Sequence, residues 1–254
     1  MRICTWNVNG IRARHVEVQR LADEHQPDLL CLQEIKATSD QVPEPLTLLR
    51  NYASLWHGAP RGYSGVSLHV RRKGAADSGP NHKMFSHPSF DFEARIVEAD
   101  IETAFGLMTI ASVYVPNGGK DFGAKLRFLE ALVVHADNRP KDRPYVICGD
   151  LNVAHTDADV HERFRKFGVV GQLPEERNTF TALLATGLRD VVRSMAPSDD
   201  QLFTWWPPWR QEKQKNRGWR IDYVLASETL KPQRFEVLRE FGTSDHAPLL
   251  VDLA

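Results

Sequence analysis

The chain has 254 residues, of which 42 % are hydrophobic and 26 % are charged, a balance typical of a soluble globular protein with a sizeable core. The formal net charge at pH 7 is −1, so no overall basic field points to a nucleic acid, and any such binding must come from local patches. Residues 1–7 contain no apolar signal core, and no stretch is long enough to cross a bilayer, so we expect a cytoplasmic protein without membrane contact.

Short apolar runs that end in a polar residue are spread along the chain and predict β-strands. They cover residues 3–6, 29–32, 108–115, 145–148, 221–225 and 249–253. Strands interspersed with helices favour layered sheets with helices outside. Because there is no break in composition and no repeat, we expect one domain over residues 1–254.

Amphipathic segments between these runs predict three helices, over residues 16–25, 125–137 and 175–185, the last with Pro174 well placed for its first turn. In the second of them the apolar side chains share one face, and Lys125 falls off that face. Two segments rich in loop-forming residues, 73–91 and the tryptophan-rich 204–218, predict long loops.

The three cysteines, Cys4, Cys31 and Cys148, each lie inside an apolar run. An odd number cannot pair completely within one chain, so we expect buried, reduced thiols in the strands of a cytosolic protein. No spacing of histidine and cysteine resembles a zinc site.

Polar side chains able to bind a metal or a phosphate recur at or beside the ends of the predicted strands. They are Asn7, Glu34, Asn117, Asp150, Asn152, Asp222, Asp245 and His246. Converging strand ends would gather them into one pocket, whose carboxylates suit Mg²⁺ and whose amides suit a phosphate. A carboxylate can also activate water, and an Asp–His pair can hold an imidazole in one tautomer. Singly, most of these motifs are as typical of turns and caps, and only their ordered recurrence favours a site.

Eight motifs carry a resemblance to a known family. They are residues 5–13 (TWNVNGIRA), 32–36 (LQEIK), 62–66 (GYSGV), 114–118 (YVPNG), 148–152 (CGDLN), 173–177 (LPEER), 216–223 (NRGWRIDY) and 244–248 (SDHAP). In this order they resemble the exonuclease III/abasic endonuclease family of the endonuclease–exonuclease–phosphatase superfamily, from end to end of the chain. The resemblance implies a four-layered α/β sandwich, in which two facing mixed β-sheets are flanked by helices.

The resemblance also implies a metal-dependent phosphodiesterase of DNA repair that hydrolyses the backbone 5′ to abasic sites. Exonuclease activity from the 3′ end and cleaning of blocked 3′ ends are implied as well. The implied cofactor is Mg²⁺, with Mn²⁺ as a substitute, held by Glu34 with Asn7 and Asp245. The implied partner is double-stranded DNA with abasic sites or blocked 3′ ends, bound by a monomer that joins the nucleoid when it acts.

Catalytic roles follow from the same resemblance. Asp150 matches the residue that activates the attacking water or protonates the leaving group, and Asn152 matches the residue that orients it and holds the phosphate. Tyr114 matches a contact to the phosphate and the transition state, a role that Asn117 shares. Asp222 matches the carboxylate that supports His246. The resemblance leaves open how Asp150 and His246 share the catalytic steps.

A further set of residues matches the family's contacts to DNA. The set is Lys36, Asn117, Lys120, Trp205, Trp209, Trp219 and Ile221. Trp205, Trp219 and Ile221 match the pocket for a flipped-out abasic sugar, which is too small for a normal nucleotide. Lys120 and Trp209 match positions that insert into the duplex, and basic residues around the tryptophan loop suit a groove that follows phosphates. For Trp206, core packing and a DNA contact both remain open.

Two alternatives remain open from the sequence alone. Other members of the superfamily hydrolyse inositol phosphates, sphingomyelin, poly(A) tails or unmodified DNA, whereas Lys36 and the motifs 114–117 and 219–222 favour the repair branch. A non-catalytic nucleic-acid-binding regulator on the same fold is the second alternative. The presence of every site carboxylate, from Glu34 to Asp245, disfavours it.

Overall fold

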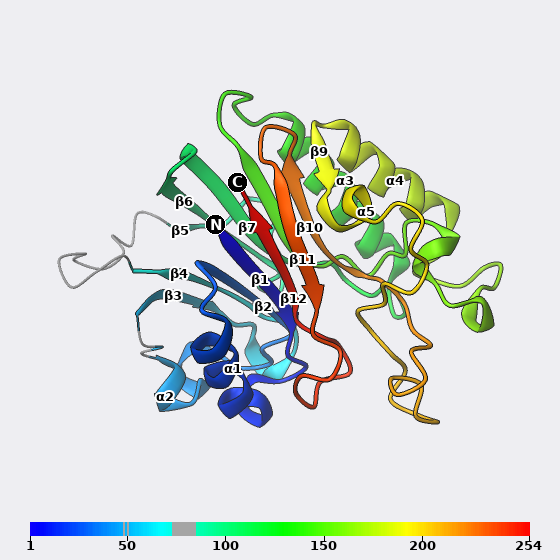
Figure 1. Ribbon diagram of the computed structural model, residues 1–254, viewed down its shortest axis with the longest axis horizontal. Helices are drawn as coiled ribbons and strands as arrows, with labels where there is room; N and C mark the ends of the chain where they lie inside the picture. The colour runs from blue at the N-terminus through cyan, green and yellow to red at the C-terminus, as the bar shows by residue number, and fades with distance from the viewer. Residues whose placement is uncertain (48, 50, 73–84) are drawn as a thin grey trace.

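Two six-stranded β-sheets face each other in the computed structural model, and helices lie outside them (Figure 1). The structure describes residues 1–47, 49, 51–72 and 85–254. The four-layered α/β sandwich implied by the sequence motifs is therefore confirmed. None of the helices in the described part of the chain is both long and apolar enough to span a membrane.

The first sheet contains both ends of the chain. In spatial order its strands are β11 (Pro232–Val237), β12 (Leu249–Leu253), β1 (Arg2–Asn7), β2 (Leu29–Gln33), β4 (Val66–Arg71) and β3 (Tyr52–His57). The central strands β1 and β2 are parallel, and all other neighbours are antiparallel.

The second sheet has the same succession of pairings. Its strands, in spatial order, are β9 (Leu188–Asp190), β10 (Asp222–Ser227), β8 (Tyr145–Asp150), β7 (Gly106–Tyr114), β6 (Ile96–Thr103) and β5 (Phe85–Ser86). Here β8 and β7 are the parallel pair, with two antiparallel pairings on each side. Along the chain, β2 is followed by the edge strand β3 and then by β4, just as β8 is followed by the edge strand β9 and then by β10. Thus β7 takes the place that β1 has in the first sheet, and β8 takes that of β2.

The helices cover the outer faces of the sheets. They are α1 (Ile11–His25), α2 (Glu44–Thr47), α3 (Phe122–Asp137), α4 (Pro174–Ala185) and α5 (Val191–Met195), with 3₁₀ turns at Ser39–Gln41, Pro60–Gly62, Asp157–Asp159 and Glu162–Phe164. The helices α1 and α2 pack on the first sheet, and α3 and α4 pack on the second. By contrast, α5 places Val191 and Val192 in the core between the sheets.

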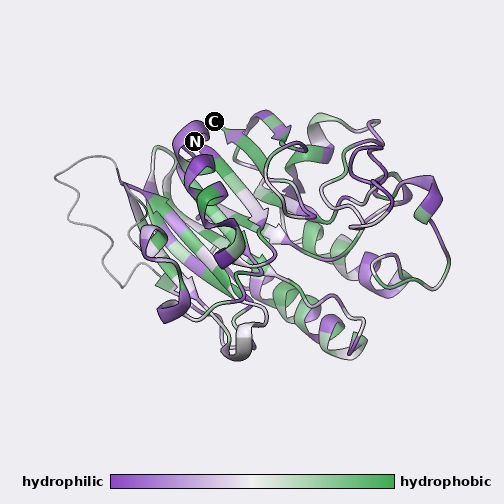
Figure 2. Cartoon of the chain, turned by 90° about the horizontal axis from the view of Figure 1, so that it is seen from below, coloured by the Kyte–Doolittle hydropathy of each residue, from purple (hydrophilic) through white to green (hydrophobic). Residues whose placement is uncertain are grey.

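The central strands β1, β2 and β8 are buried on both faces, which explains why they read as continuous apolar runs in the sequence. Successive side chains of a strand point to opposite faces, so Ile3 of β1 joins the core between the sheets while Cys4 packs toward α1. Figure 2 shows these hydrophobic residues along the strands. The prediction for the cysteines is confirmed, because Cys4, Cys31 and Cys148 are buried free thiols in β1, β2 and β8.

All six predicted strands and all three predicted helices are present, but several boundaries differ. The first helix begins at Ile11 rather than at residue 16, after Gly10 with a φ of 106° and without a side-chain cap that the sequence could reveal. Residues 73–84 of the first predicted loop lie outside the described residues, and Phe85–Ser86 pair with β6, so the loop prediction is wrong there. The other predicted loop, 204–218, contains turns and an isolated bridge.

Candidate active site

The predicted site residues meet where strands of both sheets end. Asn7 ends β1, Tyr114 ends β7 and Asp150 ends β8, while Glu34 directly follows β2. Asp222 begins β10 and lies opposite Asp150 in the antiparallel register. The two parallel strand pairs therefore present their carboxyl ends to the same place, which the packing of the two sheets brings together.

Two carboxylates and one imidazole form the centre of this site. A ligand atom from each of Glu34, Asp150 and His246 lies within 4.8 Å of the others. The buried Asn7 joins the two acids, since its Nδ2 donates to Glu34 Oε1 at 3.0 Å and to Asp150 Oδ2 at 2.9 Å. Asn7 therefore fixes the spacing of the carboxylates from behind.

His246 is held between two buried acids. Its Nδ1 lies 2.9 Å from Asp222 Oδ2, and its Nε2 lies 3.9 Å from Asp150 Oδ2. Because a carboxylate accepts at Nδ1, that nitrogen carries a proton and Nε2 faces the other acid. The structure thus brings together the Asp–His pair that the sequence predicts.

The charges of this centre shift its pKa values. Burial on its own lowers the pKa of His246, but Asp222 and Asp150 outweigh it and raise the pKa to about 10. Burial, assisted by the charge of Asp222, raises the pKa of Asp150 to about 8. Burial also raises the pKa of Tyr114, together with the charges of Glu34 and Asp150, so its hydroxyl stays a donor at neutral pH.

Asn152 is fixed beside Asp150 by hydrogen bonds at both ends. Its backbone N–H donates to Asp150 Oδ1 at 2.9 Å, and its side-chain Nδ2 donates to the carbonyl of Val115 at 2.8 Å. The side-chain amide therefore lies between β7 and β8, where one donor hydrogen remains for a substrate oxygen.

Asp245 and Glu34 are linked through a residue that the sequence analysis did not single out. Asn9 donates from Nδ2 to Asp245 Oδ1 at 2.8 Å and accepts from Lys36 Nζ at 2.5 Å. Lys36 also pairs with Glu34 Oε2 at 2.8 Å, and Trp205 Nε1 donates to Asp245 Oδ2 at 3.0 Å. Asp245 is thus held at both oxygens. The only sequence signal for Asn9 was its place in the turn after β1.

Four non-glycine residues of the site have a left-handed backbone. Their φ values are 45° at Asn9, 48° at Glu34, 50° at Lys36 and 52° at Asn152. This region is sparsely populated for residues with a Cβ, and such positions cost about 1–3 kcal/mol each and cluster at functional sites. This conformation turns the backbone sharply after the preceding strand and directs the side chain into the cleft.

The site opens into a cleft of about 450 Å³. It is lined by Asn9, Glu34, Lys36, Tyr114, Asn117, Gly119, Asp150, Asn152, Val170, Gly171, Trp205, Trp219, Ile221, Asp245 and His246. Trp205 and Trp219 meet edge to face at 6.0 Å and form an apolar wall with Ile221. Gly171 supports this wall: it has a φ of 97°, and a Cβ there would lie 2.7 Å from the ring of Trp219.

Two predicted DNA contacts lie outside the cleft. Lys120 is exposed and lines a neighbouring hollow of about 700 Å³ together with Tyr63 and Phe92. Trp209 is 56 % exposed on the loop after β9 and α5. Trp206 is 1 % exposed and packs against Phe203 and Ala247, so its role is core packing.

The comparison with known proteins assigns the chain. The family model described as the Endonuclease/Exonuclease/phosphatase family matches residues 4–246. The chain belongs to this family. The resemblance inferred from the motifs is confirmed, and the chain is a hydrolase of the nuclease type.

Two curated members of the Endonuclease/Exonuclease/phosphatase family match nearly the whole chain. Recombination repair protein 1 of Drosophila melanogaster is 32 % identical over 259 residues, which cover 99 % of this chain and 37 % of that protein. The chain thus spans little more than a third of the length of this relative. Exodeoxyribonuclease III of Haemophilus influenzae is 31 % identical over 267 residues and 98 % of both proteins.

Solved structures of the family share the fold from end to end. An AP endonuclease from Archaeoglobus fulgidus matches with a TM-score of 0.87 and 26 % identity, covering 100 % of this chain and 99 % of that chain. A Neisseria 3′ phosphatase, solved bound to a product DNA hairpin, matches with a TM-score of 0.87, 27 % identity and the same coverage.

A buried ion pair supports this nuclease site from behind and corrects one prediction. Lys125, placed off the apolar face of its helix, is fully buried and pairs with Glu176 of α4. Its Nζ also donates to the carbonyl of Asn152 at 2.6 Å. Glu176 in turn accepts from the backbone N–H of Gly171 at 2.5 Å. The pair therefore fixes both loops that line the cleft, through a partner that lies 51 residues away in the sequence.

Proposed function

We propose that the chain is a magnesium-dependent repair nuclease that hydrolyses the DNA backbone 5′ to abasic sites and also trims 3′ ends. The names of its relatives, an exodeoxyribonuclease III, an AP endonuclease and a 3′ phosphatase, support this substrate class. The observation that carries the proposal is the position of the acidic centre, Glu34, Asp150 and His246, directly beside the apolar wall of the cleft.

The apolar wall supports selection of a baseless sugar. Trp205, Trp219 and Ile221 offer ring and alkyl surfaces, and the indole Nε1 of Trp205 is already bonded to Asp245. A flipped-out deoxyribose without its base can lie against such a surface, whereas a complete nucleotide needs more room. The geometry thus favours an abasic residue next to the reactive phosphate.

The donor set fits a divalent cation that prefers oxygen. Glu34 and Asp150 supply carboxylate oxygens into the cleft, and Mg²⁺ is commonly held by one or two carboxylates together with water and substrate phosphate. Glu34 is the ligand of choice, since its pKa is lowered: burial raises it, but the hydrogen bonds from Asn7 and Lys36 outweigh burial. When bound, the cation supplies positive charge that neutralises the phosphate oxygens.

The residues of the chain would divide the hydrolysis as follows. Asp150 accepts a proton from the water whose oxygen attacks phosphorus, in keeping with its raised pKa. The bond from phosphorus to the 3′ oxygen breaks, and that oxygen leaves as a hydroxyl after taking up a proton from solvent water, while Asp150 returns its proton to solvent. His246 in its charged form, with Asn152 and Tyr114 as donors, stabilises the negative charge on the phosphate.

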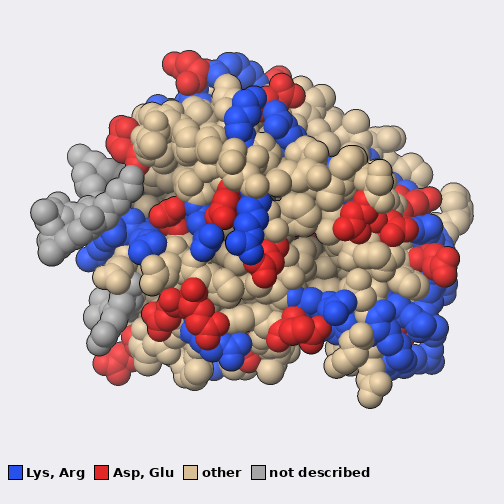
Figure 3. Space-filling view, in the orientation of Figure 1, with Lys and Arg blue, Asp and Glu red and all other residues tan. Residues whose placement is uncertain are grey.

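Basic side chains at one end of the molecule would hold the DNA strands beside the site. Figure 3 shows Lys and Arg gathered at the lower right, where Figure 1 draws the loop that precedes β10. This loop contains Arg210, Lys213, Lys215 and Arg217. Each phosphate that they neutralise steepens the salt dependence of binding, so the neutral total charge does not argue against a DNA partner.

The test is cleavage of a duplex with one central abasic site, compared with the same duplex without it, each with Mg²⁺ and with chelator. We expect a single cut at the abasic site that leaves a 3′-hydroxyl and a 5′-deoxyribose phosphate, and no cut with chelator. Binding to the abasic duplex without chelator-sensitive cleavage would instead identify a non-catalytic DNA-binding protein. Equal cutting of both duplexes would identify a nuclease without abasic specificity.

Glu34→Gln tests the cation ligand. The substitution keeps the shape of the side chain and its contact to Asn7 but removes the charge that a hard cation needs. We expect turnover to be almost abolished in dilute Mg²⁺, with partial recovery as the Mg²⁺ concentration rises. Parental activity in dilute Mg²⁺ would show that Glu34 is not the ligand.

A further inference from the structure

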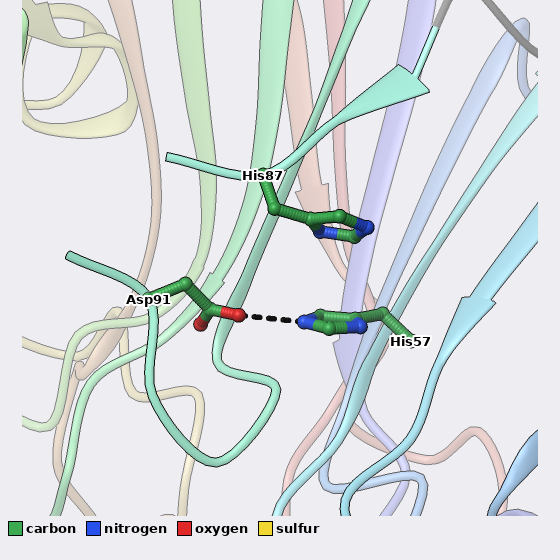
Figure 4. Close-up of side chains that lie close together, drawn as sticks. All are labelled: His57, His87 and Asp91. Carbon is green, nitrogen blue, oxygen red and sulfur yellow. Dashed lines mark hydrogen bonds and ion pairs between the residues drawn. The ribbon is translucent and has the colours of Figure 1, made fainter. Parts of the chain in front are cut away.

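A second group of metal-ligating side chains lies where the edges of the two sheets meet. His57 ends β3, the edge strand of the first sheet, and His87 follows β5, the edge strand of the second. Asp91 lies in the segment between β5 and β6. One ligand atom from each of the three lies within 4.8 Å of the others, and none of the three lines the catalytic cleft (Figure 4).

The two imidazoles and the carboxylate face one another. His57 Nε2 lies 2.6 Å from Asp91 Oδ2, and the rings of His57 and His87 are 3.9 Å apart with a tilt of 32°. Figure 4 shows the ring of His87 lying over that of His57, with the carboxylate directed at the latter. A ring nitrogen of each imidazole can offer its lone pair to a cation that the carboxylate shares.

The carboxylate is fixed in place before any ligand arrives. Asp91 Oδ1 accepts from the backbone N–H groups of Arg95 at 2.8 Å and Ile96 at 3.1 Å, which leaves Oδ2 turned toward His57. Burial raises the pKa of Asp91, but the hydrogen bonds from His57 and from the backbone outweigh burial and lower it. Asp91 is therefore ionised at neutral pH and held in one orientation, as a metal ligand must be.

We propose that His57, His87 and Asp91 form a second metal site that takes a borderline transition-metal dication such as Zn²⁺. Two imidazoles and one carboxylate suit zinc, and a site with three protein ligands keeps a fourth position for water. The oxygen-rich catalytic centre suits Mg²⁺ instead, so the two sites differ in donor chemistry. His87 is exposed and gives the ion an entry path.

The rings must move to accept the ion, because the lone pairs of two stacked rings lie in their ring planes and do not meet at one point. Zinc lies about 2.0–2.2 Å from imidazole nitrogen and carboxylate oxygen, so two of its ligand atoms are more than about 3 Å apart. The distance of 2.6 Å between His57 Nε2 and Asp91 Oδ2 must increase slightly. The ligand atom of His87, now within 4.8 Å of the other two, must move closer to them. His87 is exposed and can turn its ring toward the other two ligands, which gives up the contact of its Nδ1 to the carbonyl of Ile96 at 3.3 Å.

The bound ion would act as a clip between the two sheets. It would tie the end of β3 to the segment before β6, where Asp91 is bonded to the backbone of Arg95. The side chain of Arg95 donates to Tyr63 Oη at 3.0 Å and lies over the ring of Tyr114, which lines the catalytic cleft. The bound ion would therefore also restrict the motion of Tyr114. Its main effect is stability rather than chemistry.

The test uses the whole protein, stripped of metals and then saturated with Mg²⁺, and measures Zn²⁺ by equilibrium dialysis. We expect one Zn²⁺ per chain and, at a concentration about 100 times the dissociation constant, a rise in the unfolding temperature of about 5–10 °C. His87→Ala and Asp91→Asn should each weaken Zn²⁺ binding at least about tenfold and remove the thermal shift.

Two controls separate this site from other binding. His15→Ala removes a half-buried imidazole on α1 outside both clusters and should bind Zn²⁺ like the parent. Glu34→Gln alters the catalytic centre and should keep the ion and the shift. The proposal fails if Zn²⁺ is lost from Glu34→Gln but kept by His87→Ala. It also fails if the parent binds no Zn²⁺, in which case His57 and Asp91 form a hydrogen-bonded pair only.

Discussion

Replacement of Asp222 by asparagine tests the proposed chemistry with the smallest change of shape. Asp222 is fully buried, and its Oδ2 lies 2.9 Å from Nδ1 of His246. Its other side-chain oxygen has no hydrogen-bond partner among the described residues, so the pair with His246 is the contact that the substitution alters. The amide can still accept a hydrogen bond but cannot stabilise a charged imidazole.

The size of the effect follows from the distance between the charges. At 2.9 Å and an effective dielectric constant of about 20, the lost attraction is about 6 kcal/mol, of which a neutral hydrogen bond restores about 1 kcal/mol. The net loss is smaller than the difference of these two energies, because His246 without a charged partner gives up its proton more readily. We therefore expect the rate of the chemical step to fall by about 10²–10⁴, the range of comparable losses in other hydrolases.

The assay is single-turnover cleavage of an abasic duplex at saturating enzyme, with product binding and thermal unfolding measured on the same samples. Asp222→Asn should bind product like the parent and unfold within a few degrees of it, because the change is isosteric. A cleavage rate within about threefold of the parent would refute the role of the Asp222–His246 pair. If thermal unfolding shows that the variant has lost its fold, the lower cleavage rate reflects lost stability and not the proposed chemistry.

Three further substitutions test other parts of the molecule. Trp209→Ala should weaken binding to an abasic duplex about ten- to a hundredfold in a fluorescence titration, because an exposed aromatic ring can replace part of the lost base stacking, and trimming of a frayed 3′ end should change much less. Equal loss of both activities would contradict a wedge. Lys125→Met should cost about 3–5 kcal/mol in urea unfolding, because it leaves Glu176 buried and unpaired, and adding Glu176→Gln should recover part of this. A purely additive double variant would contradict the coupling. In Asp159, burial raises the pKa but Arg220 outweighs it, so the folded-state pKa is lowered and the stabilisation is present at neutral pH and lost as the pH falls through that value. Asp159→Asn should therefore be less stable than the parent at pH 7 and should lose less stability on acidification, and parallel curves of unfolding free energy against pH would contradict this.

The sequence predicted those parts of the fold that are buried on both faces. The six predicted strands lie at or next to the centre of their sheets, where both faces demand apolar residues. Strands nearer the edges were missed. The edge strand β11 (PQRFEV) exposes Gln233, Arg234 and Glu236. The strand β6 (IVEADIET), next to the edge strand β5, contains Glu98, whose carboxylate accepts from Tyr145 Oη at 2.5 Å. A buried acid with a distant partner looks like a surface residue in a linear pattern.

The candidate site could be predicted because its residues sit in short motifs at strand ends. The residues that support it could not. Asn9 looks like a turn residue, and Lys125 looks like the polar side of a helix until Glu176 is packed against it. Trp206 and Trp209 are three residues apart in one aromatic run, yet only one of them is buried. His57 ends a strand of one sheet and His87, 30 residues later, follows a strand of the other, so no spacing along the chain predicts their contact.

The repeated order of pairings in the two sheets has a consequence for how activity appears during folding. Asn7 at the end of β1 and Tyr114 at the end of β7 occupy equivalent places in the two halves, as do Glu34 after β2 and Asp150 at the end of β8. Each half alone therefore carries half a reaction centre, however well it is formed. In a refolding experiment, recovery of phosphodiesterase activity would time the docking of the two sheets, whereas a circular dichroism signal would time the growth of the sheets themselves.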